Sequence, residues 1–471
     1  MKLKLLTALL LCINYISAQQ PFLNVKIEDK ISSHTIKNAF FVQEKGSNSL
    51  FTFLEEEKIT YGFKYNGDKT LVSKLSSKGL KRKYKKIIAS LTDGDKVRLI
   101  ETNNKNTKYA SIIFDFETKR SEEIEYDFKL GIYEYYLQSY SHKDVSYIFS
   151  YNSTTNELYK WSFFMDGSFK KDSYALDLNY NKSSSLSQNS LNYEFQKVNN
   201  KLPNDLIIAS KRFKMYENEN GFIWTLDDNI AYTLIIECNA PEFSPKFSKL
   251  FKYKTETKAK TTNSYIFEDK IAQVVSNNSY LAFEIKNLNS NDIIKSVSIK
   301  KDDSIDFKNG PILQEGSVYS FGNIRTMEKT SKFLRKMSSE KNGISIFKMP
   351  NDNYRVTIGG VRAQGGGAPM MMPGFGGIPI GQFGAVTMSF NPAGFAYGNY
   401  NSTGSTRIEC LFDSSFNHVK GKIPDNVFDR IDEYKDKLSK SRAEDVFFID
   451  NKVLFGFYQP AIKTYQLIQF E

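Results

Sequence analysis

The sequence predicts an all-β protein built from many short antiparallel strands. The chain of 471 residues contains 28 Tyr and 37 Phe, and aromatic residues are typical of half-buried strands. Short runs of alternating apolar and polar residues recur, as in Val145 to Tyr151, where one face of a strand would be aromatic. Hairpin signals separate such runs at Asn66-Gly67, Asp93-Gly94, Asp166-Gly167 and Asn220-Gly221. These dipeptides tolerate the positive φ angles of tight hairpin turns.

The predicted strands group into sets of four. One stretch reads as a complete meander, with strands near 87–91, 96–101, 108–116 and 122–128. Four consecutive antiparallel strands make one blade of a propeller. Similar openings, a short apolar strand followed by a polar turn and a second strand, recur around Phe40, Leu91, Tyr140, Tyr216, Phe267, Phe347 and Phe448. Where these openings are close together, their spacing is about 50 residues, which is within the range of propeller repeats.

This rhythm resembles that of exported bacterial β-propeller repeat proteins over nearly the whole chain. The resemblance rests on the regular spacing of the predicted strands alone, because no tryptophan-aspartate dipeptide or kelch-type double glycine marks the blades. It implies a β-propeller of about seven four-stranded blades. The alternative is a pair of β-sandwich domains, which the same short strands would also suit. In a propeller, we expect Val453 to Phe457 and Thr464 to Phe470 to close the ring with Phe22 to Ile27.

Two segments interrupt the strand pattern. Between Pro424 and Ala443, apolar residues fall on one helical face, which predicts one short surface helix on the rim of a sheet. These residues are Val427, Phe428, Ile431, Tyr434 and Leu438. From 360 to 405 the composition changes to Gly, Met, Pro, Phe and Ala, which predicts a Gly/Met-rich loop insertion within the propeller.

The insertion is a candidate contact with a partner, because methionine side chains are flexible and polarizable and adapt to apolar surfaces. The residues that would make this contact are Met370, Met371, Met372, Phe375 and Phe383. The alternative is a passive loop, since lengthening a loop costs little free energy.

Residues 1–18 have the pattern of a cleavable secretory signal. Lys2 and Lys4 precede an apolar run from Leu5 to Ile13, and Ala18 ends a cleavage site. The run is far shorter than the about 20 residues that cross a bilayer. We therefore expect 19–471 to be exported as a single propeller-like domain without a transmembrane span. It would lie in the periplasm, at the cell surface or outside the cell.

The chain is basic, with a formal net charge of +11. A basic surface attracts anionic partners such as acidic glycans or lipid headgroups. The densest basic run is the candidate contact with an anionic surface, and it contains Lys81, Arg82, Lys83, Lys85 and Lys86. The alternative is a solvated loop that leads into an edge strand.

No catalytic or cofactor motif is recognisable. The sequence lacks a nucleophile elbow, a phosphate-binding loop and a dinucleotide fingerprint. His34, His142 and His418 do not have the spacing of metal ligands. Beyond residue 18, Cys238 and Cys410 are the cysteines that remain, and either two buried thiols or a disulfide would fit them. We therefore expect no catalytic residue, no cofactor and no metal.

These observations favour a non-catalytic exported binding or assembly scaffold of the bacterial cell envelope, with an unidentified envelope protein or glycan as its partner. Two alternatives stay open. One is a carbohydrate-active propeller enzyme that uses paired carboxylates. The other is a peripheral binder of anionic envelope surfaces, whose exposed charge contacts salt would screen. Nucleic acid is a disfavoured partner, because no basic residues are interleaved with aromatic ones in a recognisable module.

Overall fold

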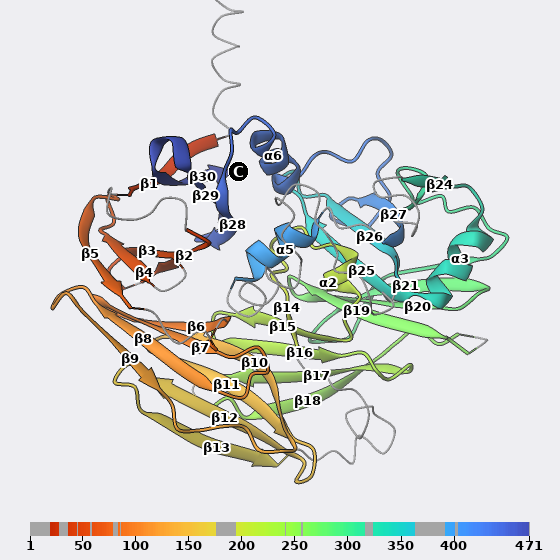
Figure 1. Cartoon of the computed structure of the whole chain (residues 1–471). Coiled ribbons are helices and arrows are strands. Elements are labelled where there is room, and N and C mark those ends of the chain that lie inside the picture. Colours follow the sequence, from red (N-terminus) through yellow and green to blue (C-terminus); the bar gives the residue numbers. More distant parts are fainter. Residues whose placement is uncertain are drawn as a thin grey trace, which may run out of the picture.

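Seven β-sheets follow one another along the chain and form a ring (Figure 1). The computed structural model describes residues 19–27, 36–44, 46–56, 59–78, 83–84, 86–175, 195–240, 242–255, 258–315, 324–362, 391–400 and 404–470. We call the sheets of these residues blades 1 to 7, in chain order from the first complete sheet. The ring confirms the predicted propeller and excludes the pair of β-sandwiches.

Blades 1 to 3 are four-stranded meanders. Blade 1 contains β2 (Asn38–Gln43), β3 (Leu50–Glu55), β4 (Thr60–Tyr65) and β5 (Leu71–Ser77). Blade 2 contains β6 (Lys86–Asp93), β7 (Lys96–Thr102), β8 (Tyr109–Asp115) and β9 (Arg120–Glu125). Blade 3 contains β10 (Glu134–His142), β11 (Val145–Asn152), β12 (Glu157–Phe164) and β13 (Phe169–Ala175). The meander predicted over 87–128 is therefore blade 2.

Blade 4 has a fifth strand, because β14 pairs in parallel with β15. It contains β14 (Gln196–Lys197), β15 (Phe213–Asn218), β16 (Gly221–Leu226), β17 (Tyr232–Asn239) and β18 (Pro245–Phe251). Blade 5 contains β19 (Thr261–Phe267), β20 (Lys270–Ser276), β21 (Tyr280–Asn287) and β22 (Ile293–Lys300).

Blades 6 and 7 depart most from a simple meander. Blade 6 contains β23 (Ile312–Gln314), β24 (Arg325–Met327), β25 (Lys341–Lys348), β26 (Tyr354–Val361) and β27 (Ser405–Phe412). Blade 7 contains β28 (Arg442–Ile449), β29 (Lys452–Gln459), β30 (Thr464–Phe470) and the N-terminal strand β1 (Gln19–Lys26), with the 3-10 helix η2 (Pro460–Ile462) before β30. Each of the predicted repeat openings falls on the first long strand of a blade.

β1 closes the ring. It pairs antiparallel with β30, with Val25 opposite Tyr465. Its side chains Leu23 and Val25 are buried, and Ile27 N donates to Lys463 O at 2.9 Å. Because the first and last strands of the chain share one sheet, the ring has no open seam between its ends. The closure predicted from the sequence is confirmed.

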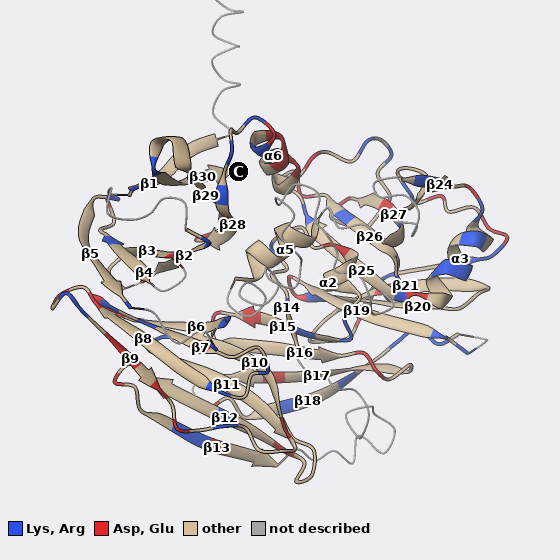
Figure 2. Ribbon diagram, viewed as in Figure 1, with Lys and Arg blue, Asp and Glu red and all other residues tan. Residues whose placement is uncertain are grey.

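Burial explains the composition of the strands. The second strand of blade 2, β7, is buried along nearly its whole length, because blades cover both of its faces. The outer strand β9 is mostly exposed and carries charged residues such as Arg120 and Glu122 (Figure 2). Charges on an outer strand oppose pairing with other chains.

The predicted hairpins form, but their glycines act in two ways. Gly94 and Gly167 have φ angles of 55° and 88°, as tight turns require. Gly221 instead begins β16, where an added Cβ would lie 2.9 Å from Asn239 Cα. Gly221 therefore permits close strand approach and does not supply a left-handed turn.

The structure contains the predicted helix and further helices that the sequence did not predict. The predicted helix is present as α6 (Val427–Lys435), and Asn426 and Asp429 form a capping box at its start. As predicted for a surface helix that packs on a sheet, its apolar residues Phe428 and Ile431 are fully buried, whereas Glu433 is exposed. The described residues also contain helices that the sequence did not predict: α2 (Leu206–Ala209), α3 (Thr330–Ser339) and α5 (Pro392–Tyr400). No helix among the described residues is long and apolar enough to cross a membrane.

Regular elements occupy both ends of the predicted insertion, 360–405, and a part of its interior. Gly360 and Val361 are the last residues of β26, and Ser405 is the first residue of β27. Pro392–Tyr400 forms α5, in which Ala393, Ala396 and Tyr397 are buried. The described part of the insertion is therefore ordered, because its apolar side chains join the core.

A buried ion triad joins blades 4 and 5. Asp227 lies 3.2 Å from both Lys214 Nζ and Lys252 Nζ, and none of these side chains is exposed. Ser264, from β19, donates to Asp227 from its backbone N at 2.9 Å and its hydroxyl at 2.7 Å. Burial alone would raise the pKa of Asp227, but the two ammonium groups lower it to about 2. The triad therefore ties neighbouring blades through a charged centre.

We predict that Asp227→Asn destabilises the protein by about 3–5 kcal/mol, because it leaves two buried ammonium groups without their carboxylate. Urea unfolding followed by tryptophan fluorescence measures this free energy. Asp68→Asn, on the exposed turn before β5, is the matched control and should leave stability unchanged. A loss below about 1 kcal/mol in Asp227→Asn, as for a surface pair, would contradict the proposed role of the triad.

Candidate functional site

Two candidate contact segments of the sequence belong to one face of the ring. The first long strand of each blade (β2, β6, β10, β15, β19, β25 or β28) begins at this face, and the strand that follows it in the chain ends there. The pairs Lys86 with Thr102 and Lys341 with Val361 show this arrangement. We call it the entry face. The basic segment 78–85 joins the end of β5 to the start of β6, so both of its ends lie at this face. The insertion joins the end of β26 to the start of β27, so its ends lie there too.

Of the basic run, the described residue Lys83 already makes contacts within the protein. Lys83 Nζ lies 2.7 Å from Glu125 Oε2, and Lys83 also covers the ring of Tyr84. Lys86 begins β6. Lys81, Arg82 and Lys85 lie outside the described residues, as do Met370, Met371, Met372, Phe375 and Phe383.

The helix α3 adds basic residues to the entry face. Its side chains Phe333, Leu334 and Met337 are buried, whereas Lys332 and Arg335 are exposed. Figure 2 shows that Lys and Arg occupy much of this helix. The helix leads directly into β25, and Gly360 lies against Met337 and Glu340. The exposed cations of α3 therefore lie on the helix that packs beside the start of the insertion.

A polar cleft of about 200 Å³ lies between blade 6 and the helices α2, α5 and α6. The alternation of side chains along the strands explains why the cleft is polar. The even-numbered residues Ile344 and Ile346 of β25 and Val356 and Ile358 of β26 are fully buried in the core. Odd-numbered residues of β25–β27 point to the opposite face, and Thr357, Arg407 and Glu409 are among those that line the cleft.

Ion pairs organise the cleft. Glu409 accepts from Arg355 Nη2 at 3.3 Å and from Arg407 Nε at 3.1 Å. Arg407 also reaches Glu315 at 2.8 Å. Burial alone would raise the pKa of Glu409, but the guanidinium groups of Arg355 and Arg407 lower it. Glu409 therefore stays ionised at neutral pH.

Tyr400 connects the helices to this network. Its hydroxyl donates to Asp429 Oδ1 at 3.0 Å and accepts from Arg355 Nη1 at 3.1 Å and from the Asn426 side chain. Burial, together with Asp429, raises the pKa of Tyr400 to about 12. The last residue of α5 and the first turn of α6 are thus held against blade 6.

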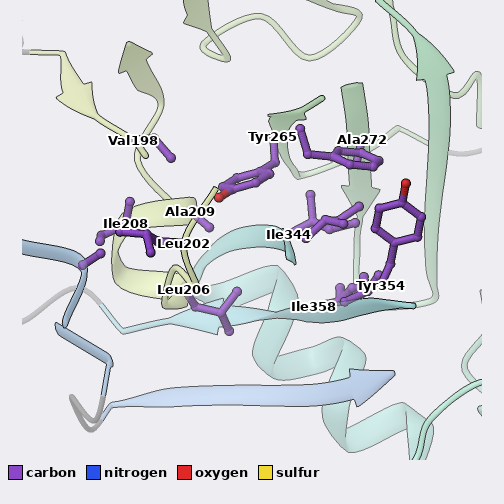
Figure 3. Close-up of a cluster of buried hydrophobic side chains, with 14 of the residues drawn as sticks. Val198, Leu202, Leu206, Ile208, Ala209, Tyr265, Ala272, Ile344, Tyr354 and Ile358 are labelled. Carbon is purple, nitrogen blue, oxygen red and sulfur yellow. The ribbon is translucent and has the colours of Figure 1, made fainter. Parts of the chain in front are cut away.

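Glycines in blade 6 let α2 pack directly on the strands. An added Cβ on Gly343 would lie 2.9 Å from Ser210 N, and one on Gly359 would lie 2.6 Å from Leu206 Cδ1 and collide with Thr406 O. Figure 3 shows Leu206 and Ile208 of α2 in the apolar cluster that also contains Ile358. This contact places Asp205 and Leu206 at the wall of the cleft.

The helix α5 is anchored to blade 7. Asn391 donates to Asp445 Oδ2 at 2.9 Å and to Val446 O at 2.8 Å, and it accepts from Gly394 N. Gly394 is required because any Cβ there would collide with the Asp445 carboxyl group. Burial raises the pKa of Asp445 to about 7.

The cleft can bind polar groups, but its chemistry does not favour acid catalysis. A glycosidase needs one carboxyl group that holds a proton, and the pKa of Glu409 is shifted in the opposite direction. Among the described residues, no group of three or more His, Cys, Asp and Glu could hold a metal ion. Cys238 and Cys410 are buried free thiols, so the structure selects the unbridged alternative.

The sequence did not identify the cleft residues. Arg355, Glu409 and Asp429 come from separate elements, and none of them belongs to a motif. One feature of the sequence indicates a polar surface here. The alternation in 354–361 places Arg355, Thr357 and Gly359 on one face of the strand, opposite an apolar face.

No known protein family and no curated protein matches the sequence. Among solved structures, the chain is similar to the WD40 domain of SCAP from fission yeast, with a TM-score of 0.33 and 8% identity over 96% of this chain and 97% of that chain. For AofleA from Arthrobotrys oligospora the TM-score is 0.24, with 10% identity over 72% and 84%. For cobalt-substituted Synechocystis ACO it is 0.28, with 6% identity over 56% and 61%. These TM-scores are low, so the propeller assignment rests on the seven sheets themselves.

We predict that Gly359→Ala destabilises the protein by about 1–3 kcal/mol, because the methyl group forces apart α2 and the strands of blade 6. Thermal and urea unfolding measure the change. Gly310→Ala is the matched control, since no atom lies within 4 Å of an added Cβ there. If both variants unfold like the wild type, α2 does not pack on β26 as described.

The raised pKa of Asp445 makes stability depend on pH. Its folded pKa is about 7 and its unfolded pKa is about 3.9. Between these values the unfolded chain releases the proton and the folded protein keeps it, so stability falls as pH rises from about 4 to 7. We predict that Asp445→Asn weakens this fall, as Tm values at pH 5 and pH 8 would show. Asp68→Asn should keep the wild-type pH dependence; an unchanged dependence in Asp445→Asn would refute the assignment.

Proposed function

We propose that this protein is a non-catalytic, exported binding or assembly scaffold of the bacterial cell envelope that holds its partner on the entry face. One observation carries the proposal: the basic segment and the Gly/Met-rich insertion both leave from and return to that face. They are separated by more than half of the sequence, and the closed ring fixes their ends on one rigid body. A single partner would therefore meet both.

Other features support this proposal. The signal pattern of residues 1–18 supports export. The exposed residues Lys332 and Arg335 of α3 add positive charge beside the start of the insertion, which suits a partner with anionic groups. The lowered pKa of Glu409 supports binding over acid catalysis in the polar cleft.

The insertion is expected to supply the apolar part of the contact. We predict that replacing Met370, Met371, Met372, Phe375 and Phe383 by Ser abolishes capture of the envelope partner by the immobilised chain 19–471. This variant keeps the chain length and leaves α5 intact, which deletion of 360–405 would not. Mass spectrometry of captured envelope fractions is the measurement. Recovery of the same partner by the variant and by the wild type would contradict the proposal.

Reversing the charge of the basic run tests its contribution separately. The triple variant Lys81→Glu, Arg82→Glu and Lys85→Glu should weaken capture, and the remaining capture should depend less on salt. The control reverses the same number of charges on the opposite face, at the exposed residues Lys119, Lys143 and Lys452. Equal loss in both triple variants would mean that net charge, and not the entry face, determines binding.

Peripheral binding to an anionic envelope surface is the second candidate, and the exposed cations of α3 favour it. Co-sedimentation with vesicles of phosphatidylglycerol and phosphatidylethanolamine separates the two candidates. Binding that is lost at high salt but unaffected by the Met and Phe replacements would favour the lipid surface over an envelope protein.

A further inference from the structure

The polar cleft of blade 6 has the features of a small-molecule site, and its lining residues are different from the candidate contact residues of the basic segment and of the insertion. It is lined by three strands of one blade and by residues from α2, α5 and α6. Its volume of about 200 Å³ is below the about 300–1,000 Å³ of sites for drug-sized ligands. The cleft therefore suits a molecule of the size of one sugar ring.

The charge of the lining disfavours an anion. Two guanidinium groups, of Arg355 and Arg407, line the cleft together with the carboxylates of Asp205, Glu409 and Asp429. Both guanidinium groups already pair with Glu409, and Arg407 also pairs with Glu315. An anionic ligand would have to replace these pairs, whereas hydroxyl groups can share the unused lone pairs of a carboxylate.

Several polar atoms remain available for hydroxyl groups. The hydroxyl of Thr357 has no hydrogen-bond partner among the described residues, and its side chain is only partly buried. A carboxylate has about four acceptor sites, and the two bonds from arginines leave Glu409 with free ones. Phe347 adds apolar ring surface to the same lining. Carboxylate, arginine and hydroxyl groups around an aromatic ring would satisfy the hydroxyls and the C–H face of a sugar.

We propose that the cleft between blade 6 and the helices α2, α5 and α6 binds an uncharged polyhydroxylated molecule of the size of one sugar ring, with Thr357 and Glu409 bonding its hydroxyl groups. The ion pairs of Arg355 and Arg407 hold Glu409 in place before the ligand arrives, so little ordering is needed on binding. Because Tyr400 ends α5, the insertion supplies one wall of this site.

Isothermal titration calorimetry and saturation-transfer NMR with glucose, galactose, mannose, N-acetylglucosamine and myo-inositol test the proposal. We expect saturable binding of at least one probe to the wild type, and none of sulfate. Thr357→Val keeps the shape of the side chain and removes its hydroxyl. It should raise Kd about five-fold, the equivalent of one lost hydrogen bond of about 1 kcal/mol.

Thr326→Val, on the exposed outer strand of the same blade, is the matched control and should bind as the wild type does. Equal Tm values of both variants would show that the fold is kept. Failure of every sugar probe, competition by sulfate, or equal Kd values for Thr357→Val and the wild type would each overturn the proposal. None of these results depends on capture of an envelope partner, so this site and the proposed scaffold function can fail separately.

Discussion

The pairing of β1 with β30 is the constraint on which the rest of the structure depends. A sheet edge carries unpaired backbone groups and invites association, and here the N-terminal strand covers the edge that β30 would present. Because the first strand completes the last blade, the seven blades must fit one closed circle. Every interface between neighbouring blades must then be filled, whatever lies along the chain between them.

The interface of blades 6 and 7 is filled by helices. α5 and α6 contribute Ala396, Phe428 and Ile431 to the core that joins the two blades. A helix does not follow the pleat of a sheet as closely as another sheet does. A polar cleft therefore remains between the helices and the side chains of β25–β27. The cleft thus follows from ring closure and from the insertion that supplies α5. The same insertion takes part in both proposed binding sites.

The strand rhythm could be predicted from the sequence because each blade is encoded locally. Alternation and hairpin dipeptides located the first long strand of every blade, from Phe40 in β2 to Phe448 in β28. The helices α2 and α5 could not be predicted in this way. α2 has four residues and depends on the distant Gly343 and Gly359. α5 is apolar without a polar face, so its composition resembles that of the glycine-rich sequence before it. Arg355 and Glu409 meet only through strand pairing across that insertion, which no spacing in the sequence reveals.

Hydrogen exchange of β1, followed by mass spectrometry, tests ring closure most directly. In an edge strand about half of the amides are paired, and here these should exchange as slowly as those of β30. Slow exchange of amides around Leu23 and Val25, lost only on global unfolding, is the result that a closed ring predicts. Exchange of all β1 amides at the rate of an unstructured chain, while β28–β30 stay protected, would contradict it.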